Sequence, residues 1–363
     1  MAPRASRPSA PHDGPVTLRM LADHLGLSPA SVSLVLNQAP GADAIPPATQ
    51  ERILAAARQF HYRPNTLARS LRRQRSLTLG VLVPDMKEGY ATLVLGGIEE
   101  RLLREGYLYF VASHRHRQDL LEQYPKLLLD RAIEGLIAVD TPCHEALPVP
   151  VVAVSGHTQT DGVTNVVLNH ERAAVLALEH LMAFGHRRIA VIKGQPFSSD
   201  MMVRWTAISA AARQLGLEID ERLVDALEGE GGLPELGYHA TRRLLAAGLP
   251  FTAVFAFNDV SAFGVIGALR DAGLSVPHDV SVVGFDDILG AASQNPPLTT
   301  VRQPLSRMGE IAAETVIKRI SAGRDARYPR EIAVEPELVV RGSTGPVRAK
   351  SHASGNMAEQ ETG

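Results

Sequence analysis

The chain has 363 residues, of which 45% are hydrophobic and 21% charged, and its formal net charge is −2. This length is too great for one ordinary domain and predicts two or three. A single cysteine, Cys143, excludes a disulfide-stapled scaffold and fits a reducing compartment. No apolar run approaches the length of a transmembrane helix, so we expect no membrane partner.

The net charge hides an asymmetry. The first 76 residues hold ten Arg and no Lys against four acidic residues, whereas the remainder is acidic. A basic head on an acidic body is expected of a DNA-binding domain with a separate ligand sensor. Residues 1–15 lack the apolar core of a signal peptide, so we predict a disordered tail and a cytoplasmic protein.

Two short helices joined by a tight turn are predicted over residues 17–37. Thr17 caps the first helix, Gly26 makes the turn, and Ser28 caps the second. The pattern fits an ordinary helical hairpin, but small and hydroxyl side chains at the start of an exposed second helix favour entry into the major groove. The DNA-contacting residues predicted here are Thr17, Ser28, Pro29, Ala30, Ser31, Ser33, Leu34 and Asn37.

A third amphipathic helix is predicted over residues 47–60, followed by a short helix that Asn65 caps. The short helix cannot be stable alone and needs a partner, and its arginines suggest that one partner is phosphate. The DNA contacts predicted in this segment are Tyr62, Asn65, Thr66, Ala68, Arg69, Leu71 and Arg72.

Beyond residue 77, short β-branched runs alternate with amphipathic helices, which predicts parallel sheets with helices on both faces. No G-x-G-x-x-G motif follows the first strand, so no dinucleotide site is indicated. The expected strands are 79–84, 108–113, 135–139, 151–154, 189–193, 253–256 and 281–285. The expected helices are 91–105, 119–131, 171–185, 202–215, 235–247, 260–272 and 304–320.

Several motifs occur in an order that resembles the LacI/GalR family of bacterial transcriptional regulators. They include Val-Ser-Leu-Val-Leu-Asn at 32–37, Tyr-Arg-Pro-Asn at 62–65, Phe-Asn-Asp at 257–259 and Asp-Val-Ser-Val-Val-Gly-Phe-Asp-Asp at 279–287. Pro-Leu-Thr-Thr-Val-Arg-Gln-Pro at 297–304 and Arg-Gly-Ser-Thr at 341–344 complete the resemblance, which covers about residues 16–344.

The resemblance implies a multidomain chain with an all-α helix-turn-helix headpiece and a two-lobed α/β core of doubly wound parallel sheets, like a periplasmic binding protein. It places the headpiece at 16–62, the hinge helix at 63–76 and the core at 77–344. The N-lobe is expected at about 77–169 and 302–330 and the C-lobe at 170–301 and 331–344. We expect the crossings near Asn169, Val301 and Arg330, and a second disordered tail at 345–363.

Ligands of open parallel sheets bind at the carboxyl ends of the strands. The resemblance implies that Asp286 holds a ligand hydroxyl, whereas Asp287, its neighbour in an extended segment, should point the other way. The planar fork of Arg204 suits vicinal hydroxyls or a carboxylate. The predicted effector-binding residues are Tyr90, His114, Asn169, His170, Arg204, Asn258, Phe285, Asp286 and Gln303.

Three alternatives concern single residues of this set. Asn258 could cap the following helix, although the family pattern favours Asn258 toward the ligand and Asp259 toward the cap. His114 and His116 could bind a metal, but a polar loop is the better interpretation, and we predict no metal site and no cofactor. Arg115 and His170 could make the cleft cationic, which would suit an acidic or phosphorylated ligand.

The sequence therefore predicts a repressor whose operator affinity is controlled by a small molecule, a sugar or sugar-derived metabolite. The family resemblance implies a homodimer on a near-palindromic double-stranded operator, so the protein would lie on the nucleoid. In the family, two leucines equivalent to Leu71 wedge into the central base step and kink the DNA. A transport receptor would need export and no basic head. An enzyme would need a nucleophile–base pair, metal cluster or phosphate loop that the sequence does not show.

Overall fold

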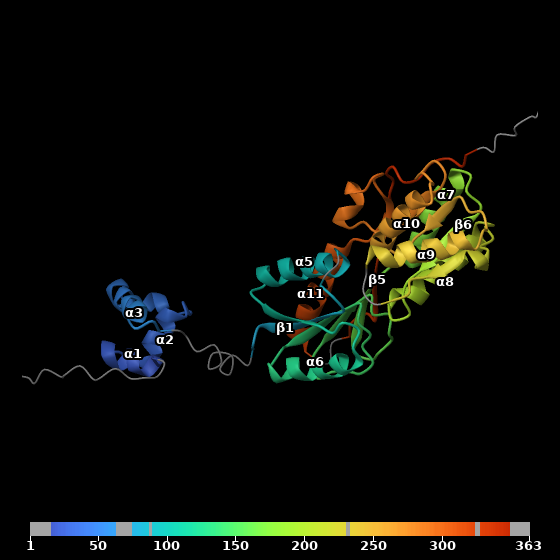
Figure 1. Cartoon of the computed structure of the whole chain (residues 1–363). Coiled ribbons are helices and arrows are strands. Elements are labelled where there is room, and N and C mark those ends of the chain that lie inside the picture. The colour runs from blue at the N-terminus through green and yellow to red at the C-terminus, as the bar shows by residue number, and fades with distance from the viewer. Residues whose placement is uncertain (1–15, 63–74, 87–88, 230–232, 324–326, 349–363) are drawn as a thin grey trace, which may run out of the picture. The chain divides into compact units, whose positions relative to one another are not determined.

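The computed structural model describes residues 16–62, 75–86, 89–229, 233–323 and 327–348 (Figure 1). The chain divides into two compact units at Ser76 and Leu77. The predicted hinge helix lies largely outside the described residues, as do the predicted contacts Asn65, Thr66, Ala68, Arg69, Leu71 and Arg72. Among the helices that the structure does describe, none is both long and apolar enough to cross a bilayer.

The first unit holds three helices, α1 (Leu18–Leu25), α2 (Pro29–Leu36) and α3 (Pro47–Gln59), with a 3-10 turn at Ala42–Ala44. The predicted caps are present, since the Thr17 hydroxyl accepts from the Met20 amide at 3.3 Å and the Ser28 hydroxyl from the Ser31 amide at 3.1 Å. Gly26 ends α1 at a φ of +64°, where a side chain would be strained. The small core between the helices consists of Leu21, Ala22, Val32, Val35, Ile53 and Ala56.

The second unit begins with the N-lobe, whose six strands are ordered β11-β5-β4-β3-β1-β2. All of its pairings are parallel. The strands are β1 (Thr78–Val83), β2 (Leu108–Ser113), β3 (Gly135–Val139), β4 (Val151–Val154), β5 (Val163–Leu168) and β11 (Glu331–Val334). Helices α5 (Gly89–Arg104) and α11 (Leu305–Ala322) pack together against one face, and α6 (Gln118–Asp130) covers the other.

The C-lobe has a second six-stranded sheet, ordered β12-β10-β9-β8-β6-β7 and parallel except for the β10–β12 pair. Its strands are β6 (Ile189–Lys193), β7 (Val224–Ala226), β8 (Ala253–Phe255), β9 (Ser281–Asp286), β10 (Thr299–Arg302) and β12 (Glu337–Val339). Its helices are α7 (His170–Ala183) and α8 (Asp200–Gln214) on one face, with α9 (Pro234–Ala246) and α10 (Asp259–Asp271) on the other. Figure 1 shows α7 to α10 gathered in this lobe.

Two expectations about the chain path need correction. The third crossing does not lie near Arg330, because β11 pairs with β5 through Val334 and the chain leaves the N-lobe only at Glu335. The C-terminal tail is not free from residue 345, since the Val347 amide donates to the Phe184 carbonyl at 2.9 Å and Arg348 pairs with Asp279 at 3.0 Å.

Candidate functional site

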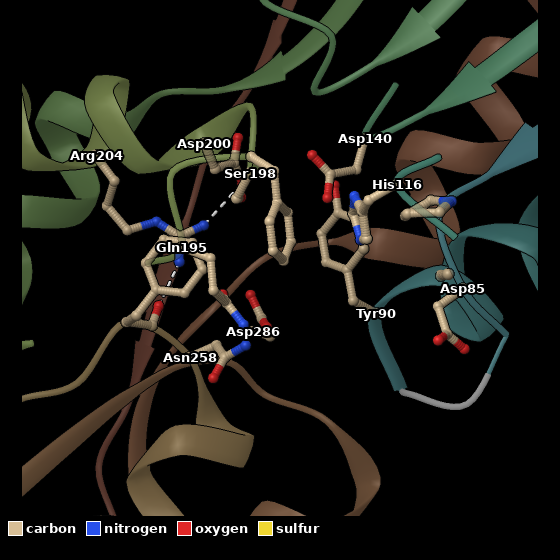
Figure 2. Close-up of a pocket in the computed structure, with 14 residues that line it drawn as sticks. Asp85, Tyr90, His116, Asp140, Gln195, Ser198, Asp200, Arg204, Asn258 and Asp286 are labelled. Carbon is tan, nitrogen blue, oxygen red and sulfur yellow. Dashed lines mark hydrogen bonds and ion pairs between the residues drawn. The ribbon is translucent and has the colours of Figure 1, made fainter. Parts of the chain in front are cut away.

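A cleft in the core gathers polar side chains from the carboxyl ends of strands of both sheets (Figure 2). Asp140 follows β3, Gln195 follows β6, and Asp286 ends β9. The edge of a parallel sheet where the strands end is the expected ligand site in such folds. The cleft is lined by Pro84, Asp85, Tyr90, Ala91, His116, Asp140, Gln195, Phe197, Ser198, Asp200, Arg204, Phe257, Asn258 and Asp286.

Asp286 presents a buried carboxyl group at the C-lobe wall of this cleft. Its backbone has a φ of +111°, which a non-glycine residue rarely adopts, so the surrounding fold holds the side chain in place. Gln303 donates to its Oδ1 at 2.6 Å. Burial raises the pKa of Asp286 well above its usual range, and Arg204 opposes that shift. Asp287 points elsewhere and pairs with Arg302 and Arg341 at 2.7 Å each, so the two neighbouring carboxyl groups form no joint site.

Arg204 is buried between two aromatic rings on the floor of the cleft. Its guanidinium lies 3.7 Å from the ring centre of Phe285 and 4.5 Å from that of Phe257. It donates to the Phe257 carbonyl and, at 2.8 Å, to Asp200 Oδ2. Its Nε is buried and has no hydrogen-bond partner.

Asn258 has two roles at the end of β8. Its side-chain oxygen accepts from the Ser261 amide at 2.9 Å, and the Ser261 hydroxyl accepts from the Asn258 amide at 3.1 Å. These two bonds form a capping box at the start of α10. The expectation that Asp259 caps α10 is therefore wrong, because Asn258 is the cap. Asn258 also lines the cleft, as expected. Asp259 instead accepts from Thr300 and Ile288, and burial raises its pKa to about 7.

The N-lobe wall carries a hydroxyl and a carboxyl group. Tyr90 donates to the Ser155 hydroxyl at 2.9 Å. Asp140 accepts from the amide of Ser199, a C-lobe residue, at 3.2 Å. Burial raises the pKa of Asp140 to about 7, and repulsion by Asp200 adds to the shift. Since Ser199 also donates to the Ser155 carbonyl, the two lobes are joined by hydrogen bonds at the cleft.

Aromatic rings close the cleft from opposite sides. The ring of His116 in the N-lobe lies 4.0 Å from that of Phe197 in the C-lobe, centre to centre. Phe197 retains 39% of its surface exposed, so it stands at the rim. A ligand held between these walls would have both polar edges and apolar faces to contact.

Four of the predicted effector-binding residues line the cleft, namely Tyr90, Arg204, Asn258 and Asp286. Phe285 and Gln303 are buried behind them and support Arg204 and Asp286. His114 is buried and bonds Thr141 at 2.9 Å. Asn169 caps α7 and donates to Glu335 at 3.1 Å, which ties two of the crossings together. His170 faces Asp200 from behind.

The sequence did not indicate Asp85, Asp140, Gln195, Phe197, Ser198 or Asp200. A carboxylate directly after a predicted strand could have pointed to Asp85 and Asp140 by the strand-end rule. Asp200 precedes the predicted helix and looks like a surface cap. The segment 195–198 carries no pattern from which a cleft lining could be inferred.

The two residues expected to make the cleft cationic, Arg115 and His170, do not line it. Arg115 is not part of the lining, and His170 lies behind Asp200. Four carboxyl groups line the cleft against one guanidinium. The surroundings therefore offer many acceptors and little positive charge to an anion.

Known proteins resemble this chain along most of its length. Residues 178–344 match the periplasmic binding protein-like domain family. An HTH-type transcriptional repressor PurR of Haemophilus influenzae is 30% identical over 343 residues, which cover 90% of this chain and 98% of that protein. The chain belongs to the LacI/GalR family of transcriptional regulators. Its role is the control of transcription rather than catalysis.

Solved structures agree with this assignment. The lac repressor dimer bound to operator and the anti-inducer ONPF is 25% identical, has a TM-score of 0.78, and is covered in full by 92% of this chain. The transcriptional regulator CelR in complex with cellobiose is 28% identical with a TM-score of 0.66, covering 90% of this chain and 99% of that one.

The helix-turn-helix unit of this family member offers a small polar surface on α2. Ser28, Pro29 and Ala30 are exposed, and Ser31, Ser33 and Leu34 are half-buried. Asn37 folds back on its own helix and donates to the Ser33 carbonyl at 2.8 Å. Tyr62 packs against the headpiece core, and burial raises its pKa.

Proposed function

We propose that the protein is a dimeric repressor of a near-palindromic operator. Its operator affinity changes when a neutral, hydroxyl-rich ligand binds in the cleft. The observation that carries the proposal is the acidic lining of Asp85, Asp140, Asp200 and Asp286 around a single arginine. Carboxyl groups form hydrogen bonds with sugar hydroxyls in either protonation state. The ionised carboxylate of Asp200, whose pKa His170, His157 and Arg204 hold well below its usual range against the effect of burial, repels a phosphate or a carboxylate. The sugar complex of CelR, a structural neighbour, is consistent with this class.

The aromatic residues of the cleft support the same class of ligand. Tyr90, Phe197 and Phe257 lie on its walls. The apolar face of a pyranose or furanose ring packs well on such side chains, while its edge hydroxyls reach the surrounding carboxyl groups. Arg204 supplies the complementary donor.

The ligand class can be tested by calorimetric titration of neutral sugars, polyols, sugar acids, sugar phosphates and nucleobases. We expect binding of a neutral sugar or polyol, and at least about tenfold weaker binding to Asp286→Asn, because a hydrogen bond to a charged or partly charged group contributes about 1.5–3 kcal/mol. Asp130→Asn, an exposed carboxylate on α6, is the control. Tight binding of a phosphate or acid alone would contradict the proposal.

The DNA-binding part of the proposal concerns the exposed start of α2 and the segment that follows the headpiece. Readout would use Pro29, Ala30 and Ser33, with apolar contact to thymine methyl groups. In the family arrangement Leu71 wedges into the central base step from each subunit, so the dimer would act where its operator lies, on the nucleoid.

Replacing Leu71 by Ala should lower operator affinity about tenfold or more, since unstacking a base step costs a few kcal/mol that the wedge offsets. Genomic selection of binding sites, followed by affinity and DNA-bending assays on the selected site, tests this. Ligand binding to the core should be unaffected. An unchanged affinity and bend, or a monomer that selects no palindrome, would contradict the proposal.

A further inference from the structure

A buried cluster of two histidines and one carboxylate lies beside the cleft. His157 Nε2 lies 2.6 Å from Asp200 Oδ1, and His170 Nε2 lies 3.4 Å from the same oxygen. The three donor atoms all fall within 4.8 Å of one another, a grouping found nowhere else in the described part of the chain. Because the three residues are far apart in the sequence, no spacing motif reveals them.

The cluster joins the two lobes. His157 follows β4 of the N-lobe, whereas His170 is the first residue of α7 and Asp200 the first of α8 in the C-lobe. His157 has a φ of +51°, a conformation that non-glycine residues adopt rarely. The fold thus holds an imidazole from one lobe against a carboxylate of the other.

The hydrogen-bonding of His170 is incomplete. Its side chain is only 4% exposed, yet neither ring nitrogen makes a hydrogen bond, and Nε2 is aimed at Asp200. A buried polar atom without a partner is unfavourable, so such groups usually have a ligand or a functional reason. Asp200 is fully engaged on its far side, where Arg204 donates to Oδ2 at 2.8 Å.

A cavity of about 500 Å³ borders the cluster on the side away from the effector cleft. His157 and His170 both line it, together with Asn169, Met202 and Glu331. Asp200 lines the effector cleft on the other side, where Figure 2 shows it next to Ser198. The cluster therefore separates the effector cleft from a space that can hold water.

From these observations we infer that His157, His170 and Asp200 bind one divalent transition metal ion of the zinc type, which ties the two lobes together. Two imidazoles and one carboxylate are the donors that zinc, cobalt(II) and nickel(II) accept, whereas magnesium and calcium require oxygen. Three protein ligands leave a coordination position for a water molecule from the rear cavity. Binding replaces the hydrogen bond between His157 and Asp200, and the neutral imidazole of His157 then carries its proton on Nδ1.

The surrounding charge favours a cation. Burial raises the pKa values of Asp140 and Asp286, and repulsion by Asp200 adds to both shifts. Arg204 is the only guanidinium in the cleft lining. A metal ion next to Asp200 would reduce this repulsion. If the cleft binds the effector as proposed above, the ion would also hold Arg204 and Asp200 in the closed arrangement and so strengthen effector binding.

The test uses the untagged full-length protein after removal of metals with a chelator, and it needs no effector, so its result does not depend on the proposed ligand class. Zinc is titrated calorimetrically, and cobalt(II) is followed by its visible absorption, which reports tetrahedral coordination. We expect one ion per chain, and an affinity lower by about 100-fold or more in His157→Ala and His170→Ala.

His144→Ala and His239→Ala are the controls, because both histidines are exposed and outside the cluster. His157→Gln provides a second variant that keeps a donor toward Asp200 but is a poor metal ligand. Circular dichroism and thermal unfolding of the metal-free variants establish that they fold. Zinc binding that is absent, that persists in both cluster variants, or that is lost equally in the control variants overturns the proposal. Loss in His170→Ala but not in His157→Ala would overturn the bridge between the lobes.

Discussion

His114 shows how a buried side chain can be tied to one protonation state. The Thr141 hydroxyl donates to the Val139 carbonyl at 2.7 Å, so it must accept from His114 Nε2, 2.9 Å away. The other ring nitrogen, Nδ1, accepts from the His116 amide at 3.1 Å. Protonation of Nδ1 would place two donors against each other. Burial, followed by repulsion from His116, lowers the pKa of His114 to about 4.

This geometry predicts an acid-sensitive core. Above the unfolded pKa of about 6.5 neither state binds the proton and the stabilisation is complete, while below it the unfolded chain is protonated first. Lowering the pH from about 7.5 to about 5 should reduce the free energy of unfolding by about 2 kcal/mol through His114 alone. Urea unfolding of the wild type and of His114→Asn, which keeps an acceptor for the His116 amide, measures the difference. Equal pH dependence in the two proteins would refute the assignment.

Asn258 allows the cap and the ligand contact to be separated. A serine at this position can still accept from the Ser261 amide, since serine is as good a cap as asparagine, but it lacks the side-chain amide that lines the cleft. Asn258→Ser should therefore retain stability and lose effector affinity, whereas Asn258→Ala should also lose about 1 kcal/mol of unfolding free energy. Thermal unfolding combined with effector titration checks both. If both variants kept the effector affinity of the wild type, Asn258 would be a helix cap without a ligand contact.

At the scale of the residue, two side chains expected to bind the effector do line the cleft: Asp286, where a motif marks a strand end, and Arg204, which the family pattern names. Their contact with an effector stays a prediction. It misplaced Asn169, His170 and Gln303, because these polar residues at the crossings and at the end of β10 turn toward other parts of the chain. Such choices depend on tertiary hydrogen bonds, which no local pattern records.

At the scale of the element, the tight crossing of α5 and α11 depends on glycine. A Cβ atom on Gly97 would lie 1.8 Å from the Ser306 carbonyl oxygen, and one on Gly309 would lie 2.1 Å from that of Val94. The two backbones therefore approach each other more closely than any side chain permits. Since α11 returns from the C-lobe, this contact anchors the crossing that follows β10.

Gly97→Ala should accordingly destabilise the core by about 1–3 kcal/mol, the usual penalty for overpacking. The neighbouring Gly96 provides a matched control, because a Cβ there meets nothing within 4 Å. Gly96→Ala should be neutral or stabilising by about 0.5–1 kcal/mol, as alanine favours a helix over glycine. Chemical denaturation measures the free energy of unfolding of both variants. Equal changes in the two would contradict the predicted close contact between α5 and α11.

The alternation of strands and helices predicted most of the core elements, yet five strands were not expected. These are β5, β7, β10, β11 and β12. β7 and β12 have only three residues each, which is too few to show a periodic apolar pattern. β11 is half-exposed and lacks the continuous apolar run of a buried strand. β11 joins the N-lobe sheet because β5 leaves an edge for it, which is a property of the assembled sheet.

At the scale of the whole molecule, regulation requires that the core have two arrangements with different affinities for the effector. The contacts between the lobes mark one of them: Ser199 with Asp140, His116 with Phe197, and His157 with Asp200. The first two lie at the cleft and the third directly behind it, so an effector that adds contacts to both walls would favour this arrangement. A ligand that touched one wall alone would shift nothing.

The coupling must be reciprocal. If the effector changes operator affinity by some factor, operator DNA must change effector affinity by the same factor, because both measure one coupling free energy, commonly about 1–3 kcal/mol or roughly 5- to 150-fold. Calorimetric titration of the effector with and without saturating operator should therefore agree with operator titrations at zero and saturating effector. In Phe197→Ala, which removes a contact between the lobes without touching the headpiece, both factors should change together. Because the thermodynamic cycle must close, unequal factors would mean that one of the titrations had not reached equilibrium or saturation. A factor of one in both titrations would mean that the cleft does not control DNA binding.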